Sequence, residues 1–137
     1  MSKLEEQLIR HEGYRKYPYT DTVGKLTVAI GRNLDDVGIF KEEAMIMLRN
    51  DLKHCEEDLT GTLPWFSHLD PIRQDALMNM CFNLGIVRLS GFKNMLEALK
   101  EGRYHDAARE ALDSKWAKQV GKRSDEIAFM LRNGEYP

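Results

Sequence analysis

Two carboxyl groups near the start of the chain, those of Glu12 and Asp21, could form a general acid and base pair. Glu12 lies four residues after Leu8, so it borders the apolar side of an expected helix, in its last turn. Partial burial and the negative end of the helix dipole both favour a protonated carboxyl, which a general acid requires. Asp21 lies in a polar turn, where we expect it to remain ionised. The same two residues also occur as ordinary helix-end and turn residues, so spacing alone does not decide between these interpretations.

The elements that must position these residues are a helix and a β-hairpin. Apolar residues at helical spacing predict a helix from about Lys3 to Glu12, with Gly13 as its stop. The segment 14–31, rich in Tyr, Thr and Val, predicts a β-hairpin that has Asp21 in its turn. Pro18 restricts its strand to an edge of the sheet, because proline has no N–H to donate to a neighbouring strand.

The rest of the chain is expected to be helical. Apolar residues at three- and four-residue steps predict a long amphipathic helix from about residue 40 to 59, although its start lacks a Ser, Thr, Asp or Asn cap. Asp70-Pro71 predicts the start of a helix that ends at Gly85. Further helices are expected from Ser90-Gly91-Phe92 to Gly102, from Tyr104 to Leu112 and from Arg123 to Arg132, with Trp116 between the last two.

The composition limits the classes of protein that the chain can belong to. Its 137 residues suit a single domain, with an N-lobe of about residues 1–59 and a C-lobe of about 60–137. The 20 Lys and Arg against 22 Asp and Glu argue against a nucleic-acid-binding protein, because no basic face is expected. No apolar run reaches the roughly 18 residues of a membrane span. The first residues have no apolar signal-peptide region, so we expect synthesis in a cytoplasm.

Cysteine usage indicates buried thiols. Cys55 and Cys81 both fall within apolar helical patterns, which favours two reduced core residues over a disulfide. His54 lies beside Cys55, but no second ligand pair has zinc-type spacing, so no metal is expected.

The run from Glu12 to Gly31, with Asp21 and Thr27 at fixed spacing, closely resembles the active-site signature of the phage-type lysozymes, family 24 of the glycoside hydrolases. The resemblance covers the chain from Leu4 to Tyr136. It continues in the segments Ile39–Ala44, Asn79–Gly85, Ser114–Trp116 and Arg132–Gly134. It implies a lysozyme-like α+β fold, in which a small β-hairpin N-lobe is joined by a long helix to an all-helical C-lobe.

The resemblance also implies a reaction and the residues that perform it. Glu12 would protonate the leaving glycosidic oxygen, Asp21 would act as base for a water on the opposite face of the sugar, and Thr27 would position that water. The family is associated with inversion at the anomeric carbon. The implied substrate is the peptidoglycan glycan strand, cleaved without a cofactor or metal at the β-1,4 bond between N-acetylmuramic acid and N-acetylglucosamine. We expect a monomeric phage or prophage endolysin that reaches the cell wall through a holin.

Four further residues correspond to positions at the family's substrate cleft: Phe82, Asn83, Gln119 and Arg123. Arg123 would face Glu12 and orient it, although an arginine at a helix start is also typical of a solvated cation. Phe82 on its own is more typical of a core residue, and Asn83 of a helix end.

Three features depart from the family pattern. Ala29 lies where glycine is usual, Arg32 lies where histidine is usual, and the segment from Asn33 to Gly38 is short. By resemblance, Arg32 and Asp51 face one another, which predicts an ion pair between them. The alternative is a solvated Arg32 whose aliphatic part covers apolar surface.

Two other functions remain open at this stage. A lytic transglycosylase also needs a catalytic Glu, but Asp21 and Thr27 at the family spacing favour hydrolysis. A non-catalytic peptidoglycan-binding or phage structural module has no need of an acid, so an intact Glu12 argues against it.

Overall fold

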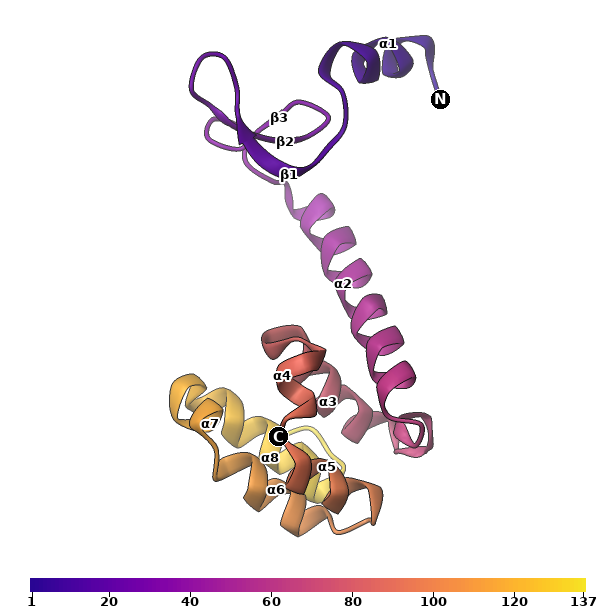
Figure 1. Cartoon of the computed structure of the whole chain (residues 1–137), viewed down its shortest axis with the longest axis vertical. Coiled ribbons are helices and arrows are strands. Elements are labelled where there is room, and N and C mark those ends of the chain that lie inside the picture. The colour runs from indigo at the N-terminus through magenta and orange to yellow at the C-terminus, as the bar shows by residue number, and fades with distance from the viewer. The chain divides into compact units, whose positions relative to one another are not determined.

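The computed structural model describes all residues, 1–137, and consists of two compact units. Unit 1 is Met1–Met47 and unit 2 is Leu48–Pro137. The helix α2 (Lys41–Thr62) belongs partly to each unit (Figure 1). A small sheet in unit 1 and helices throughout unit 2 confirm the predicted α+β fold class. No helix has the length and apolar character needed to cross a membrane. The expected single domain with two lobes stays a prediction.

Helix α1 (Lys3–Glu12) has the predicted boundaries. At its start the Ser2 hydroxyl accepts a hydrogen bond from the backbone N–H of Glu5 at 3.0 Å. At its end the N–H of Gly13 donates to the carbonyl of Ile9 at 2.8 Å. Local capping therefore sets both ends. The apolar stripe of α1 was expected to be covered, but no residue of this helix is buried.

Three strands form one antiparallel sheet in the order β1-β2-β3 (Figure 1). They are β1 (Arg15–Thr20), β2 (Leu26–Ala29) and β3 (Arg32–Asn33). The first two strands form the predicted hairpin, and Pro18 lies on the edge strand β1 as expected, within an irregularity of the pairing. Strand β3 was not predicted, because two residues are too few to show an alternating pattern.

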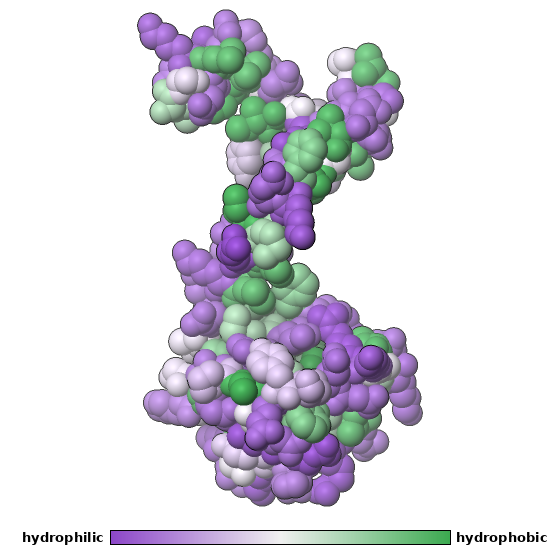
Figure 2. Space-filling model, turned by 180° about the vertical axis from the view of Figure 1, so that it is seen from behind, coloured by the Kyte–Doolittle hydropathy of each residue, from purple (hydrophilic) through white to green (hydrophobic).

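Unit 1 contains no buried apolar side chain, and Thr27 is its one buried residue. Apolar side chains, green in Figure 2, instead lie on its surface. Examples that are more than two-fifths exposed are Leu4, Leu8, Ile30, Ile39, Phe40 and Ile46. The conformation of this unit therefore depends on backbone pairing and on side-chain hydrogen bonds more than on a core of its own.

Ala29 has an unusual backbone conformation where the chain turns from β2 into β3. It is the only residue other than glycine with a positive φ, +58°. A side chain in this left-handed region costs about 1–2 kcal/mol. We expect Ala29→Gly to raise the free energy of unfolding by up to about 1 kcal/mol, because the freer unfolded chain of the glycine variant offsets part of the gain. Denaturant titration measures this difference.

Ala44 provides the control for this prediction, because it is an exposed residue of α2 with ordinary helical geometry. Ala44→Gly makes the same chemical change and should lower stability by about 1 kcal/mol. If both substitutions destabilise the protein equally, Ala29 is not strained.

The predicted ion pair between Arg32 and Asp51 is wrong, because the partner of Arg32 is Glu43. One guanidinium nitrogen donates to Glu43 Oε1 at 2.6 Å and to the carbonyl of Gly38 at 3.1 Å, and the other donates to Glu43 Oε2. The short connection after β3 brings the first turn of α2 next to Arg32. Asp51 lies eight residues further on, about 12 Å along the helix axis, so Glu43 is the carboxylate within reach.

Glu43 also supplies the start signal that the sequence of α2 seemed to lack. Its Oε1 accepts the backbone N–H of Phe40 at 2.9 Å, which is one half of a capping box. The hydrogen bonds from Arg32 and then from Phe40 lower the pKa of Glu43 from its ordinary 4.5 to about 2. The Glu43 carboxylate thus caps the start of α2 and links this helix to β3 through Arg32.

This pKa shift predicts a pH dependence of stability. Since the pKa of Glu43 is lower in the folded state, its stabilisation should be present above about pH 4.5 and be lost as the pH falls toward 2. Thermal melts of the wild type and Glu43→Gln should therefore differ at pH 6 and converge near pH 2. The difference should be modest and weaken in salt, because both side chains are partly exposed. Arg32 stays charged, so we expect no loss from this pair between pH 6 and pH 8.

Glu42 precedes Glu43 in the same helical turn and forms no ion pair, which makes Glu42→Gln the matched control. Its melting temperature should follow that of the wild type down to pH 2. A Glu43→Gln difference that stays constant with pH would contradict the role given to the ion pair.

Unit 2 holds the hydrophobic core. Its helices after α2 are η1 (Phe66–His68), α3 (Pro71–Leu84), α4 (Ile86–Ser90), α5 (Lys93–Lys100), α6 (Tyr104–Leu112), α7 (Lys115–Val120) and α8 (Lys122–Asn133). The largest fully buried side chains are Phe66, Leu59, Leu77, Met80, Leu89, Met95, Leu99, Ile127 and Leu131. As predicted, Asp70 caps α3 by accepting the N–H of Arg73 at 3.1 Å, and Pro71 begins the helix.

Two short helices of this unit, α4 and α7, were not predicted. Ser90 ends α4 instead of opening the next helix, which begins at Lys93. Trp116 lies inside α7 and not in a connection between helices. Helices of five and six residues make fewer than two turns, so they show no apolar periodicity that a sequence pattern could reveal.

Arg73 ties α3 to the end of α8. Its Nε donates to the carbonyl of Leu131 at 2.7 Å, and a second nitrogen donates to the carbonyl of Arg132 at 2.9 Å. The third nitrogen pairs with Asp70 at 3.0 Å, while the guanidinium lies 3.5 Å from the centre of the Tyr104 ring. The side chain is only 12% exposed. Arg73 therefore satisfies the last carbonyls of a helix with a cation that also favours its dipole.

The two cysteines are buried, unpaired thiols, as predicted. Burial, with the neighbouring Cys55 as a further cause, raises the pKa of the Cys81 thiol to about 12. Cys81 therefore carries no thiolate at neutral pH and is a core residue.

Candidate active site

Glu12, at the end of α1, lies against the turn between β2 and β3. Its side chain contacts Gly31 so closely that a Cβ on Gly31 would lie 2.8 Å from both Cδ and Oε2 of Glu12. The carboxyl group is exposed within this unit, which leaves it accessible to a ligand. The contact joins the last residue of α1 to the end of β2, so the fold of unit 1 determines where this acid lies.

Asp21 closes the turn between β1 and β2. Its Oδ1 accepts the backbone N–H groups of Val23 at 3.0 Å and Lys25 at 2.8 Å, and its own N–H donates to the Lys25 carbonyl at 2.9 Å. An Asp in such a turn satisfies backbone donors that would otherwise face water. Both side-chain bonds end on Oδ1, so Oδ2 is left to accept a proton or a water.

Thr27 is the buried residue at the second position of β2. Its hydroxyl donates to the Lys25 carbonyl at 3.0 Å, so the same carbonyl oxygen holds both Asp21 and Thr27. Because the hydroxyl hydrogen is used in this bond, the oxygen is left as an acceptor. Thr27 can therefore receive a hydrogen bond from a water but cannot donate one while this contact persists.

These three residues follow the course of β2. Asp21 lies in the turn before this strand, Thr27 lies within it, and Glu12 contacts the turn after it. A four-residue strand is about 10 Å long, and Asp21 and the Gly31 contact of Glu12 lie beyond its opposite ends. The structure thus brings all three predicted catalytic residues to one small sheet.

The predicted substrate-binding residues all lie in unit 2. Phe82 and Arg123 line the same cavity, of about 370 Å³. Phe82 is 44% exposed and is therefore not a core residue. The Nε of Arg123 donates to Oδ1 of Asn79 on α3 at 2.9 Å, so this arginine is held by a neighbouring helix and is not a freely solvated cation. The expected pairing of Arg123 with Glu12 concerns the other unit and stays a prediction.

Asn83 has a structural contact that the sequence did not suggest. Its Oδ1 accepts the indole N–H of Trp116 at 2.8 Å, which ties the end of α3 to α7. The buried Trp116 ring packs edge-on against Phe92, with 6.1 Å between ring centres. Asn83 therefore orients an aromatic residue that borders a pocket.

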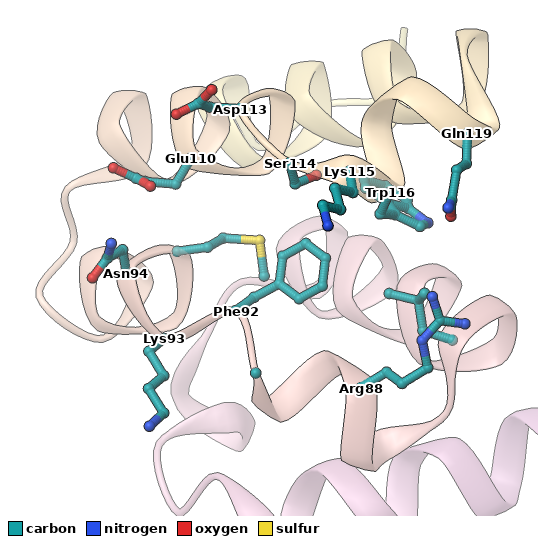
Figure 3. Close-up of a pocket in the computed structure, with 13 residues that line it drawn as sticks. Arg88, Phe92, Lys93, Asn94, Glu110, Asp113, Ser114, Lys115, Trp116 and Gln119 are labelled. Atoms are coloured by element: carbon teal, nitrogen blue, oxygen red, sulfur yellow. The ribbon is translucent and has the colours of Figure 1, made fainter.

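That pocket, of about 480 Å³, is where Gln119 lies. Figure 3 shows Phe92 and Trp116 in its middle, with Gln119 and Arg88 toward one end. Lys115 also points toward this space, whereas Lys93 points away (Figure 3). The sequence did not indicate Arg88 as a residue of this pocket, because it lies in α4, which was not predicted. Lys115 also lines the pocket, and its place in the family-like segment Ser114–Trp116 could have indicated it.

No group of three or more His, Cys, Asp or Glu side chains is arranged to hold a metal ion. At the sheet, Glu12 and Asp21 supply two carboxyl groups and Thr27 supplies a hydroxyl.

The chain is similar to known proteins over nearly its whole length. The model of the family described as Phage lysozyme matches residues 9–132. Two probable T4-type lysozymes of Dictyostelium discoideum are 28% and 26% identical, over 98% of this chain and 96% of their own. The pre-baseplate central spike protein Gp5 of Enterobacteria phage T4 is 26% identical over 96% of this chain, which spans only 28% of that protein.

Proposed function

Because the chain belongs to the phage lysozyme family, whose members degrade peptidoglycan, we propose that it is an inverting muramidase. The bond cleaved is the β-1,4 link between N-acetylmuramic acid and N-acetylglucosamine. The observation that supports this proposal most is that Asp21 lies before β2, Thr27 lies within it, and Glu12 contacts Gly31 after it. An inverting enzyme needs room for a water between its carboxyl groups, and a strand of about 10 Å between the two turns is compatible with that need.

In the proposed reaction, Glu12 donates its proton to the glycosidic oxygen as the bond from that oxygen to the anomeric carbon breaks. A water attacks the same carbon from the opposite face and transfers a proton to Asp21. The free Oδ2 of Asp21 is the acceptor, because Oδ1 is occupied by the amides of Val23 and Lys25. The Thr27 oxygen accepts the second hydrogen of this water and so directs its lone pair toward the sugar.

The glycan strand is proposed to contact four residues of unit 2. Gln119 offers an amide beside Phe92 and Trp116 in its pocket. Asn83 orients Trp116 through their hydrogen bond, and its own exposed side chain would also contact the glycan. Phe82 offers an exposed ring, and Arg123, held by Asn79, a cation. We further propose that the protein works as a monomeric endolysin in lysis of a bacterial host and needs no cofactor.

Analysis of the reaction products tests this proposal. Purified Gram-negative peptidoglycan should yield fragments with free reducing N-acetylmuramic acid, and proton NMR should show the α-anomer forming first. Anhydro-sugars would identify a lytic transglycosylase, and a first-formed β-anomer would identify a retaining enzyme. Binding without any product would identify a non-catalytic module. Each of these three results would overturn the proposed reaction.

A further inference from the structure

We propose that Gly31 is a positioning residue for Glu12, because its lack of a side chain leaves free the space that the carboxyl group of the acid occupies. This inference rests on the proposed function of Glu12. A Cβ at Gly31 would lie 2.8 Å from Cδ and Oε2 of Glu12 and 2.9 Å from its Cγ. Non-bonded carbon atoms in contact are separated by about 3.5–4.0 Å. The carboxyl group therefore occupies space that any other residue at 31 would need for itself.

The group that must yield to a larger residue is the Glu12 side chain. All three atoms nearest to the added Cβ belong to it, and none belongs to the backbone. Glu12 is exposed, so its carboxyl group can swing away without breaking any packing. A methyl group at position 31 thus displaces the acid and leaves the sheet in place. Moving a catalytic group by about 1 Å can lower the rate on the order of 10²-fold.

A substitution at Gly31 also strains the backbone, and Gly38 provides a control for that effect. The two glycines have nearly the same φ, +68° and +72°. A Cβ on Gly38 would meet nothing within 4 Å. Gly38→Ala therefore reproduces the strain of Gly31→Ala without the contact to Glu12, and both glycines belong to unit 1.

The experiment compares Gly31→Ala with Gly38→Ala in kcat and KM on soluble glycan fragments, melting temperature, and the ¹³C resonance of the Glu12 carboxyl. We expect both variants to show similar losses in melting temperature. Only Gly31→Ala should lose about 10²-fold in kcat, with KM nearly unchanged, and only this variant should shift the Glu12 resonance. Equal kcat losses in both variants, or an unchanged resonance in Gly31→Ala, would overturn the inference.

A second pair of variants tests whether Gly31 acts through Glu12. In the Glu12→Gln background, adding Gly31→Ala should cause no further loss of kcat, because the acid is already absent. A further tenfold loss there would overturn the inference. If Gly31→Ala proves less stable than Gly38→Ala, adding Glu12→Ala should abolish the difference in stability, because it removes the side chain that the new methyl group meets. A difference that persists in the Glu12→Ala background would also overturn the inference. Full activity of Glu12→Gln alone would instead refute the proposed function, whatever the resonance shows.

Discussion

Glu12→Gln should lower the rate of peptidoglycan hydrolysis by at least about 10²–10⁴-fold, the range typical of general acid catalysis. The amide keeps the shape of the side chain but has no acidic proton to donate to the leaving oxygen. Since Glu12 is exposed and its contact with Gly31 is preserved, folding should be unaffected. The decrease in turbidity of permeabilised Gram-negative cells measures the rate.

Glu6→Gln is the matched control, because Glu6 is an exposed carboxylate of the same helix. It should lyse cells at the wild-type rate, and the melting temperatures of all three proteins should agree within a degree or two. Near-normal lysis by Glu12→Gln would show that Glu12 is not the general acid. A large drop in its melting temperature would show that the loss of activity has a structural origin.

Arg73→Met should lower the free energy of unfolding by about 2–4 kcal/mol. The substitution leaves the carbonyls of Leu131 and Arg132 without their charged donor and leaves Asp70 without its partner. Removing one member of a fully buried ion pair costs about 3–5 kcal/mol, but Asp70 is 35% exposed, which places the expected loss below that range. Methionine keeps the apolar contact with Tyr104, so the loss reports on hydrogen bonds and charge.

Two further variants sharpen this prediction, and denaturant titration measures all of them. Arg73→Lys keeps the charge but cannot reach both carbonyls and Asp70 together, so it should recover less than half of the loss. Arg109→Met removes an arginine whose side chain is 71% exposed, and it should change stability by no more than about 0.5 kcal/mol. Equal effects at the two arginines would show that Arg73 contributes little to the end of α8.

The sequence predicts those elements of this fold that have strong local signals. Helix α1 begins and ends at caps that can be read directly, and the Asp70-Pro71 start of α3 is equally clear. Helix α2 is long enough for its apolar spacing to be detected, but its start depends on Glu43 and Arg32, which are distant from the usual capping position. Short elements such as β3 and α7 depend on tertiary contacts, which a local pattern cannot contain.

The candidate site shows the same division between local and tertiary information. The positions of Asp21 and Thr27 follow from a turn that five consecutive residues define, so a sequence pattern contains them. The contact between Glu12 and Gly31 joins a helix to a turn, and only the folded unit reveals it. The partner of Arg32 was predicted wrongly because Asp51 was inferred from the family pattern, whereas in this chain the short connection between β3 and α2 brings Glu43 within reach.

The shared use of the Lys25 carbonyl has a consequence for motion in this sheet. The backbone N–H of Asp21 and the hydroxyl of Thr27 both donate to this one oxygen atom, so we expect the two residues to move together when the β1–β2 turn fluctuates. Glu12 contacts the other turn, at the far end of β2, so we expect it to move independently of that pair. In the proposed reaction, the two residues that hold the water would then move as one body and the acid as another. Mutations that loosen the β2–β3 turn should therefore change the acid-to-base distance while leaving the geometry around the water intact.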